Sequence, residues 1–192
     1  MRLILSIMAN IVPSLETERL LLKPLALDDA PAIQAIFPQW EIVRFLASHI
    51  PWPYPPDGAE SFLRTVALPG MAAGTEWHWS LRQKAEPERL IGVISLLIGE
   101  KNNRGFWIAP EWRGQGLMSE AVVAVTDFWF EVLGRDLLRA PKAVENIASR
   151  RISQSSGMRM VGVETHSFVS GEHPAEIWEI TAAEWRAHRA AG

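Results

Sequence analysis

The chain has 192 residues, of which 48% are hydrophobic and 21% charged, and its formal net charge is −3 at pH 7. This length and composition predict one globular domain rather than a disordered chain. Because the sequence has no cysteine, disulfides, thiolate metal sites and a cysteine nucleophile are excluded. The acidic balance argues against direct nucleic-acid binding, and five scattered histidines offer no metal-ligand spacing, so we expect no metal.

We expect residues 1–14 to be an N-terminal extension and residues 15–192 to be a single domain. The apolar run at residues 1–9 is too short to span a membrane, and no convincing signal-peptide cleavage site follows it. We therefore predict a cytoplasmic protein without membrane contact, with Met8 as an alternative start.

The first part of the chain predicts one strand followed by helices. Asp28 is expected to cap the first helix, and Asp57 with Glu60 forms the pattern of a capping box. The prolines at 51–56 predict a stiff loop between helices. In chain order, we expect a strand at 18–25 and helices at 28–37, 40–47 and 57–69, the last stopped by Pro69-Gly70.

The middle of the chain predicts strands in close succession, hence an antiparallel meander. Trp77, Trp79 and Leu81 alternate with polar residues, which indicates a strand with one apolar face. A capping box at Thr181 and Glu184 predicts a C-terminal helix. The expected strands are 76–81, 90–98, 104–108, 137–144, 160–169 and 176–181, and the expected helices are 117–134 and 147–156. This is a mixed α/β fold with a mostly antiparallel sheet.

The segment from Ile108 to Met118 carries the strongest chemical signal. A strand ends at Pro110, a tight loop with Gly114 and Gly116 follows, and a long helix begins. Glycines turn backbone N–H groups toward one point, and a helix N-terminus adds free donors and partial positive charge. Such a loop is typical of phosphate or pyrophosphate binding, although a plain strand-to-helix turn is the alternative.

A second candidate lies at the next junction between a strand and a helix. Asn146 and Ser149 are three residues apart, so both side chains fall on one helix face. They either point into a shared site or form an ordinary N-terminal cap.

Together these segments resemble the GNAT superfamily of acetyl-CoA-dependent N-acetyltransferases. Residues 110–121 (PEWRGQGLMSEA) look like its pyrophosphate signature. Residues 146–158 (NIASRRISQSSGM) resemble a segment of the branch that acetylates N-terminal amines of ribosomal proteins. Residues 15–25 (LETERLLLKPL) and 51–63 (PWPYPPDGAESFL) also fit this branch.

The resemblance implies a splayed parallel strand pair formed by residues 104–108 and 137–144, into which pantetheine inserts. No metal is implied. The cofactor residues that it implies are Trp107 and Ile108 through their backbone, Arg113, Gly114, Gln115, Gly116, Leu117 and Met118 at the pyrophosphate, and Asn146.

The resemblance also implies direct attack of a primary amine on the thioester. The chain has no tyrosine on the helix after Asn146, so Ser149 is the expected hydroxyl near the sulfur. Glu41 is the catalytic base in our prediction, with Glu100 and His78 as alternatives. For the acceptor site we predict Trp40, Trp52 and Tyr54, which are otherwise core or rim aromatics.

Three alternatives to a protein N-terminal acetyltransferase stay open at this point. In the first alternative, the enzyme acetylates a small amine or an antibiotic. In the second, the domain binds or senses acyl-CoA without turnover. In the third, it is an ordinary nucleotide-binding module. The last is disfavoured because no Walker lysine follows the glycines. We expect a monomer or a homodimer.

Overall fold

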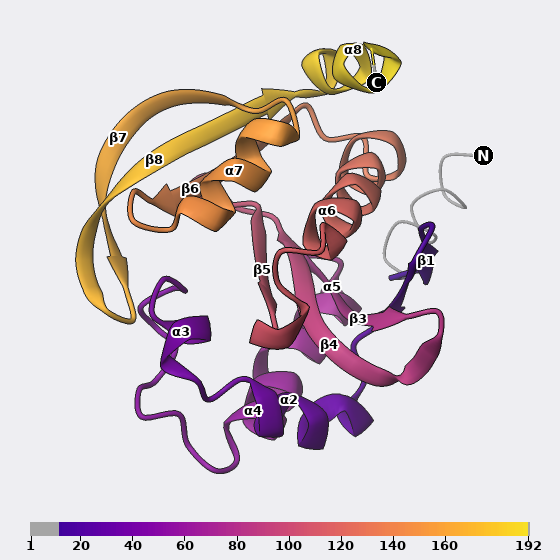
Figure 1. The fold of residues 1–192 in the computed structure, drawn as a ribbon, viewed down its shortest axis with the longest axis vertical. Coiled ribbons are helices and arrows are strands. Elements are labelled where there is room, and N and C mark those ends of the chain that lie inside the picture. The colour runs from indigo at the N-terminus through magenta and orange to yellow at the C-terminus, as the bar shows by residue number, and fades with distance from the viewer. Residues whose placement is uncertain (1–11, 192) are drawn as a thin grey trace.

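The computed structural model describes residues 12–191, which form two antiparallel sheets. One has the strand order β1-β2-β3-β4-β5 and the other β6-β8-β7 (Figure 1). The strands are β1 (Leu15–Glu16), β2 (Leu20–Pro24), β3 (Glu76–Gln83), β4 (Glu86–Leu97), β5 (Arg104–Ile108), β6 (Leu137–Ala143), β7 (Arg159–Phe168) and β8 (Gly171–Thr181). The mixed α/β fold and the meander of β3, β4 and β5 are therefore confirmed.

Helices flank the sheets. The α-helices are α2 (Ala30–Ile36), α3 (Trp40–Val43), α4 (Gly58–Phe62), α5 (Leu68–Ala73), α6 (Leu117–Asp127), α7 (Ile147–Ser155) and α8 (Ala182–Ala191). Short 3₁₀ turns, η1 (Leu27–Asp29) and η3 (Pro110–Trp112), and π-helical turns, η2 (Leu63–Ala67) and η4 (Phe128–Val132), extend some of them. Figure 1 shows α2 and α4 at one end of β4 and α6 beside β5.

The five-stranded sheet separates two hydrophobic cores. As predicted, Trp77, Trp79 and Leu81 share one face of β3, and they are buried in the core that includes α6. The opposite face of the sheet packs against α2, α4 and η2. His78 lies on that second face and is buried, because helices cover it rather than solvent.

The helix predicted at 117–134 forms, but its last turn is π-helical. Leu117, Ala121, Val125 and Phe128 are buried along one stripe as predicted. Val132 was expected on the same stripe and is instead exposed. A π-helical turn holds an extra residue, which rotates the following side chain away from the core.

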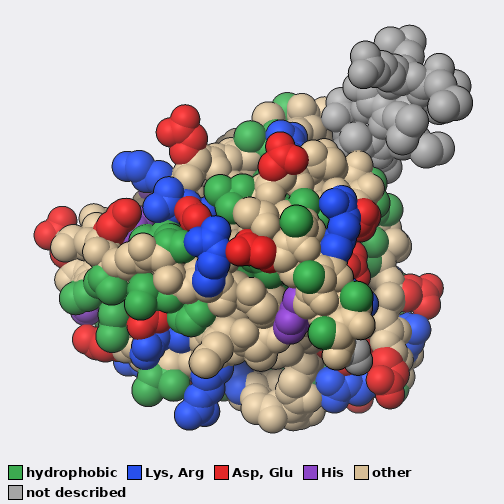
Figure 2. Space-filling model, turned by 90° about the horizontal axis from the view of Figure 1, so that it is seen from above, with side chains coloured by type: hydrophobic (Ala, Val, Ile, Leu, Met, Phe, Trp, Pro, Cys, Tyr) green, Lys and Arg blue, Asp and Glu red, His purple; other side chains and the backbone are tan. Residues whose placement is uncertain are grey.

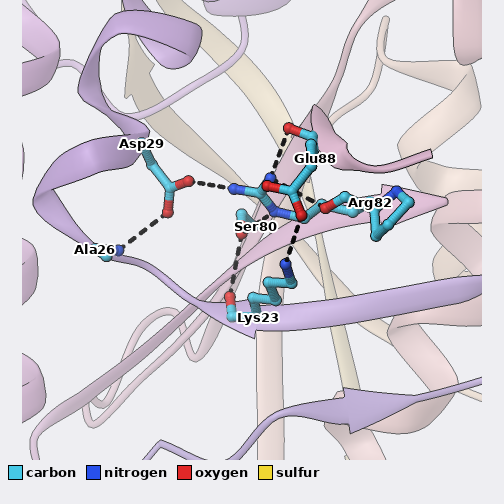
Figure 3. A network of polar contacts seen from close by, with 7 residues as sticks. Lys23, Ala26, Asp29, Ser80, Arg82 and Glu88 are labelled. Carbon is cyan, nitrogen blue, oxygen red and sulfur yellow. Dashed lines mark hydrogen bonds and ion pairs between the residues drawn. The ribbon is translucent and has the colours of Figure 1, made fainter. Parts of the chain in front are cut away.

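The cap of the first helix differs from the prediction. Asp28 does not cap it, and α2 has no side-chain capping bond; the Asp29 carboxylate instead accepts the Ala26 N–H at 3.0 Å, at the start of the preceding turn η1. The other carboxylate oxygen pairs with Arg82 on β3, as Figure 3 shows. Arg82 also donates to the backbone carbonyls of Pro87 and Glu88. This buried network holds the start of α2 against the sheet.

The predicted helix at 57–69 is also longer and differently capped. Asp57 precedes α4 without a side-chain capping bond, and Glu60 instead pairs with Arg64 at 2.8 Å. Pro69 does not stop the helix, because it occupies the first turn of α5, where a proline loses no necessary N–H bond. The chain turns at Gly74, whose φ is +67°.

The helix expected at 40–47 ends early, as α3. Beyond Val43 the backbone forms hydrogen bonds with the β7–β8 hairpin instead. The Ser170 N–H donates to the Arg44 carbonyl and the Val169 N–H donates to the Leu46 carbonyl, both at 3.0 Å. Tertiary contacts therefore replace the last helical turn. The strand expected at 90–98 begins earlier, at residue 86, since a tight turn connects it to β3.

β6 forms as predicted despite Pro141. The strand lies at an edge of its sheet and pairs only with β8, so the missing proline N–H interrupts no ladder. α7 ends before Gly157, whose φ is +74°. The C-terminal capping box is confirmed, since the Glu184 N–H donates to Thr181 Oγ1 and Glu184 accepts the Thr181 N–H.

The described chain packs against the sheet from its first residues. Val12 is buried in the core that contains Trp79, and the Pro13 carbonyl accepts the Trp79 indole N–H at 2.7 Å. Residues 12–14, placed by prediction in the extension, thus contact the domain. Residues 1–11, which include Met8, lie outside the described residues.

Charges of both signs are interspersed on the face shown in Figure 2, and hydrophobic side chains gather on the side where Figure 1 places β7 and β8. Met160, Val161 and Val163 of β7 are among the exposed hydrophobic residues. None of the helices within residues 12–191 is both long and apolar enough to cross a bilayer.

Candidate active site between two diverging strands

The candidate site begins where β5 and β6 meet and then separate. The Asn103 N–H donates to the Arg139 carbonyl at 2.7 Å, and the Arg139 N–H donates to Asn103 Oδ1 at 2.8 Å. Past this point the strands belong to different sheets (Figure 1). Asn103 also donates to the Leu97 and Gly99 carbonyls, so its side chain connects β4, β5 and β6. This connection is the closed end of the V-shaped opening between β5 and β6, called the V below. The predicted splayed pair is therefore present.

The backbone alternation of β5 determines which groups face the open side. The Leu97 N–H donates to Asn103 O and the Ala109 N–H donates to Ile91 O, so odd-numbered residues of β5 bond to β4. The backbone groups of Phe106 and Ile108 consequently point toward β6. Ile108, a predicted pantetheine residue, is on this side; the backbone of the other, Trp107, faces β4.

The loop after β5 has the geometry of an anion site. Gly114 and Gly116 both have positive φ, +75° and +77°. Among the described residues, no backbone carbonyl accepts the N–H of Gly114, Gly116, Leu117 or Met118. A Cβ added at Gly114 would meet nothing within 4 Å. The loop and the N-terminus of the 11-residue helix α6 thus leave several donors free.

Two arginines lie beside this loop. Arg113, a predicted pyrophosphate ligand, reaches across to α3, where its guanidinium lies 3.4 Å from the Glu41 carboxylate. Arg19 was not predicted; it donates to the Gln115 carbonyl at 2.9 Å and pairs with Glu120 of α6 at 2.7 Å. No local pattern indicates Arg19, because the turn between β1 and β2, 96 positions before Gln115 in the sequence, brings it to the loop.

The Gln115 side chain turns back to the Glu111 carbonyl at 3.1 Å. At the second junction, Asn146 is an N-cap: its Oδ1 accepts the Ser149 N–H at 3.2 Å. Ser149 is buried on the first turn of α7. Its hydroxyl forms no hydrogen bond with any other residue of the 12–191 range. The cap thus uses the amide oxygen of Asn146 and leaves its NH₂ group available.

The predicted acceptor residues fall into two aromatic contacts. Trp40 and Trp52 have ring centroids 5.4 Å apart, and both are more than 40% exposed. Tyr54 packs edge-on against Phe37 at 4.9 Å, and Phe37 in turn contacts Trp107. Burial, with the nearby Asp57 charge, raises the pKa of Tyr54 to about 12. Of the three, Tyr54 packs into the core on the α2 and α4 side of the sheet.

Two buried cations inside the V were missed by sequence reasoning. Arg104 of β5 is buried against Thr126 and Met158, and burial lowers its pKa to about 10. Lys142 of β6 is 8% exposed, and its Nζ lies 4.9 Å from the centroid of the Phe106 ring. The pKa of Lys142 is lowered to about 7, mainly by burial and to a smaller extent by the nearby charge of Arg104. A lysine in a strand gives no sequence signal of such an environment.

A hydrogen-bonded chain of Glu76, His78 and Ser95 lies on the other face of the sheet. His78 is 2% exposed, and its ring nitrogens lie 2.7 Å from the Glu76 carboxylate and 2.7 Å from Ser95 Oγ. Ser95 is opposite Gly105 of β5, where an added Cβ would meet nothing within 4 Å. Glu100, the other alternative base, belongs to the exposed β4–β5 connection. Within the described range, no group of three His, Cys, Asp or Glu residues is arranged to hold a metal ion.

Comparison with known proteins agrees with this geometry. The family described as "Acetyltransferase (GNAT) domain" matches residues 19–159. The chain is 30% identical over 162 residues to "Uncharacterized N-acetyltransferase YoaA" of Bacillus subtilis (strain 168), covering 79% of this chain and 85% of that protein.

Solved structures share the fold at low sequence identity. Mycobacterium smegmatis RimJ, in complex with CoA-disulfide, has a TM-score of 0.78 at 17% identity, over 95% of each chain. The ribosomal-protein-S5-alanine acetyltransferase of Vibrio fischeri has a TM-score of 0.76 at 16% identity, over 90% of this chain and 98% of that one. These structures share the fold, and the family match together with the relative YoaA shows that the chain belongs to the GNAT acetyltransferase family and is an acyltransferase enzyme.

Proposed function

We propose that this protein transfers the acetyl group of acetyl-CoA to a primary amine, by direct attack in a ternary complex, with a protein N-terminus as the acceptor. The observation that carries the proposal is the combination of a free β5 edge with a donor-rich glycine loop at the end of the same strand. One ligand that holds both a peptide-like arm and a pyrophosphate suits these two features together.

The glycine loop suits the pyrophosphate. The unpaired N–H groups of Gly114, Gly116, Leu117 and Met118 would hold its oxygens, and the α6 N-terminus adds partial positive charge. Arg113 and Arg19 lie next to the loop and contribute full charges. The NH₂ group of Asn146 and the Gln115 backbone are the further cofactor contacts that we propose.

The free edge of β5 suits the pantetheine arm. The backbone groups of Phe106 and Ile108 would bond its amides as a neighbouring strand does, and a backbone N–H there would polarise the thioester carbonyl. Acetyl-CoA supplies an activated acetyl group as a thioester. The chain must position that group, accept a proton from the amine and stabilise the leaving sulfur.

An α-amine needs little help to lose its proton before it attacks the thioester. Its pKa is about 7.7–8.0, against about 10.4 for a lysine, so a weak base or water suffices near neutral pH. Glu41 is our proposed base, although its carboxylate now pairs with Arg113. His78 is the alternative, because the Ser95 hydroxyl would relay a proton to it and Glu76 would stabilise the imidazolium.

The acceptor side is inferred from the aromatic residues and from the structural neighbours. Tyr54 is connected through Phe37 to Trp107, and the exposed Trp40 and Trp52 offer apolar surface on which an extended peptide would pack. The structural neighbours include enzymes named for ribosomal-protein alanine and serine acetylation. We propose the same acceptor class here.

Binding of CoA provides the test of the loop assignment. Ligand at about 100 times its Kd stabilises a protein by about 2.7 kcal/mol, which is roughly 5–10 °C in Tm for a domain of this size. Gly116→Asp should remove this shift, because it places a carboxylate against the pyrophosphate.

Gly134→Asp is the matched control for this experiment. Gly134 also has a positive φ, +63°, and open space around it, but it follows η4 at the other end of the helix. The control should keep the full CoA shift. Equal shifts for the wild type and Gly116→Asp would contradict the assignment.

A further inference from the structure

Lys142 is a buried cation without an opposite charge. Its side chain is more than nine-tenths buried between β5 and β6, with Nζ over the Phe106 ring. In the part of the chain that the structure describes, its ammonium forms no hydrogen bond and no ion pair. Because lysines are almost never buried unless paired, its location calls for a function or a missing partner.

The charged groups around Lys142 leave positive charge uncompensated. Glu176 of β8 is directly opposite it in the strand register, but this carboxylate is held by Arg150 of α7 and by the Trp178 indole. Arg104 of β5 has no carboxylate partner among residues 12–191, and its Nε is buried without a hydrogen bond. The V is therefore prepared to receive negative charge.

We propose that Lys142 is the acid that protonates the leaving thiolate of CoA. The proposal rests on the acetyl-transfer function above. A thioester bound along the free edge of β5 lies among the side chains that line the V. Of the two cations there, Arg104 donates to Thr126 and Met158, whereas the Lys142 ammonium contacts only the Phe106 ring and keeps its N–H donors for a ligand.

The proton and electron balance of this step is simple. The amine nitrogen forms a bond to the carbonyl carbon, the carbon–sulfur bond breaks, and the electron pair goes to sulfur. The amine loses one proton to the base or to water, and Lys142 gives one proton from Nζ to the sulfur. The transfer is downhill, because a thiol has a pKa of about 8.5 and that of Lys142 is about 7.

Other side chains fit this role less well. The Ser149 hydroxyl is a poor proton donor, and we assign it a supporting hydrogen bond to the sulfur. Tyr54 packs against Phe37 on the opposite side of the sheet, and burial raises its pKa. The pKa of Arg104, about 10, stays above that of a thiol, about 8.5, so proton transfer from Arg104 to the thiolate is uphill.

The test compares Lys142→Met with Lys142→Arg in the full-length protein, with acetyl-CoA and an amine acceptor. Lys142→Met should lower kcat about a hundredfold, leave the acetyl-CoA KM within about threefold, and remove the fall of kcat at alkaline pH. Lys142→Arg keeps the charge but not the acid, so it should also lose the alkaline fall. Lys84→Met, at an exposed lysine paired with Glu16, is the control and should leave the profile unchanged.

A second readout needs no acceptor. With CoA bound, Lys142 and the thiol titrate as a pair that shares one proton after the first has left, so the ultraviolet absorbance of the thiolate should appear at lower pH in the wild type than in Lys142→Met. Equal thiol pKa values, or wild-type kcat in Lys142→Met, would overturn the proposal. A stable acetyl group on Lys142 after incubation with acetyl-CoA would also overturn it, because the lysine would then be an acceptor.

Failure of the proposed function would look different. In that case wild-type protein would neither bind CoA nor acetylate any amine, and this inference would fall with it.

Discussion

The Lys142→Met variant should be more stable than the wild-type protein at neutral pH, whatever the enzyme acetylates. Burial lowers the pKa of Lys142 from 10.5 to about 7, and each unit is worth 1.36 kcal/mol, so the folded state loses at most about 5 kcal/mol by holding this ammonium. Relaxation around the site reduces the cost, and we expect about 2–3 kcal/mol. Methionine has a similar length and no charge.

The sign of the pH dependence follows from linkage. Between about pH 7 and pH 10 the unfolded chain holds a proton on Lys142 that the folded chain does not. The wild type therefore gains stability from this group as the pH rises, and loses it as the pH falls through 7. Lys142→Met has no titrating group at this position. The free energy of unfolding of the variant therefore exceeds that of the wild type most near pH 6.5, and the difference shrinks toward pH 10.

Thermal unfolding of both proteins across this range measures the difference directly. A gain of 2–3 kcal/mol corresponds to roughly 5–10 °C in Tm at pH 6.5, shrinking to within about 2 °C at pH 10. A Tm difference that does not change with pH, or a wild type more stable than the variant at pH 6.5, would refute the claim that Lys142 is buried without a charged partner.

Three further substitutions probe the site and its support. Ser149→Ala should lower turnover by tens to about a hundredfold with little change in CoA affinity; turnover within about threefold of wild type would leave it a structural residue. Glu41→Gln should lower kcat at neutral pH and leave the acetyl-CoA KM within about threefold, and a wild-type kcat in this variant would remove Glu41 as the base. Asp29→Ala should cost about 3–5 kcal/mol in urea unfolding, because Arg82 is left buried and unpaired; a loss below about 1 kcal/mol would contradict this.

Much of the fold was predictable because its signals are local. The alternation of Trp77 and Trp79, the glycines at 114 and 116, and the capping box at Thr181 each sit within a few residues, and the structure confirms the elements they predict. Helix ends were predicted less well. No side chain caps α2 directly; the Asp29 carboxylate instead binds the Ala26 N–H at the start of η1, and a buried arginine on a distant strand holds it there.

The interior of the site was not predictable because its contacts join residues that are far apart in the sequence. Asn103, Arg19 and Lys142 matter through partners 36 to 101 positions away: Asn103 meets Arg139, Arg19 meets Glu120, and Lys142 lies over Phe106 on a neighbouring strand. Only the assembled sheets reveal that Lys142 is buried and uncompensated. Residue type alone predicts a solvated lysine at that position.

Acceptor-dependent release of CoA tests the central claim most directly. Wild-type protein is mixed with acetyl-CoA and a panel of peptides with free N-termini, the same peptides with blocked N-termini, and small amines, and free thiol is followed over time. We predict thiol release that requires a free α-amine and a peptide product heavier by one acetyl group. CoA binding without thiol release on any acceptor would contradict the account and favour a non-catalytic acyl-CoA sensor.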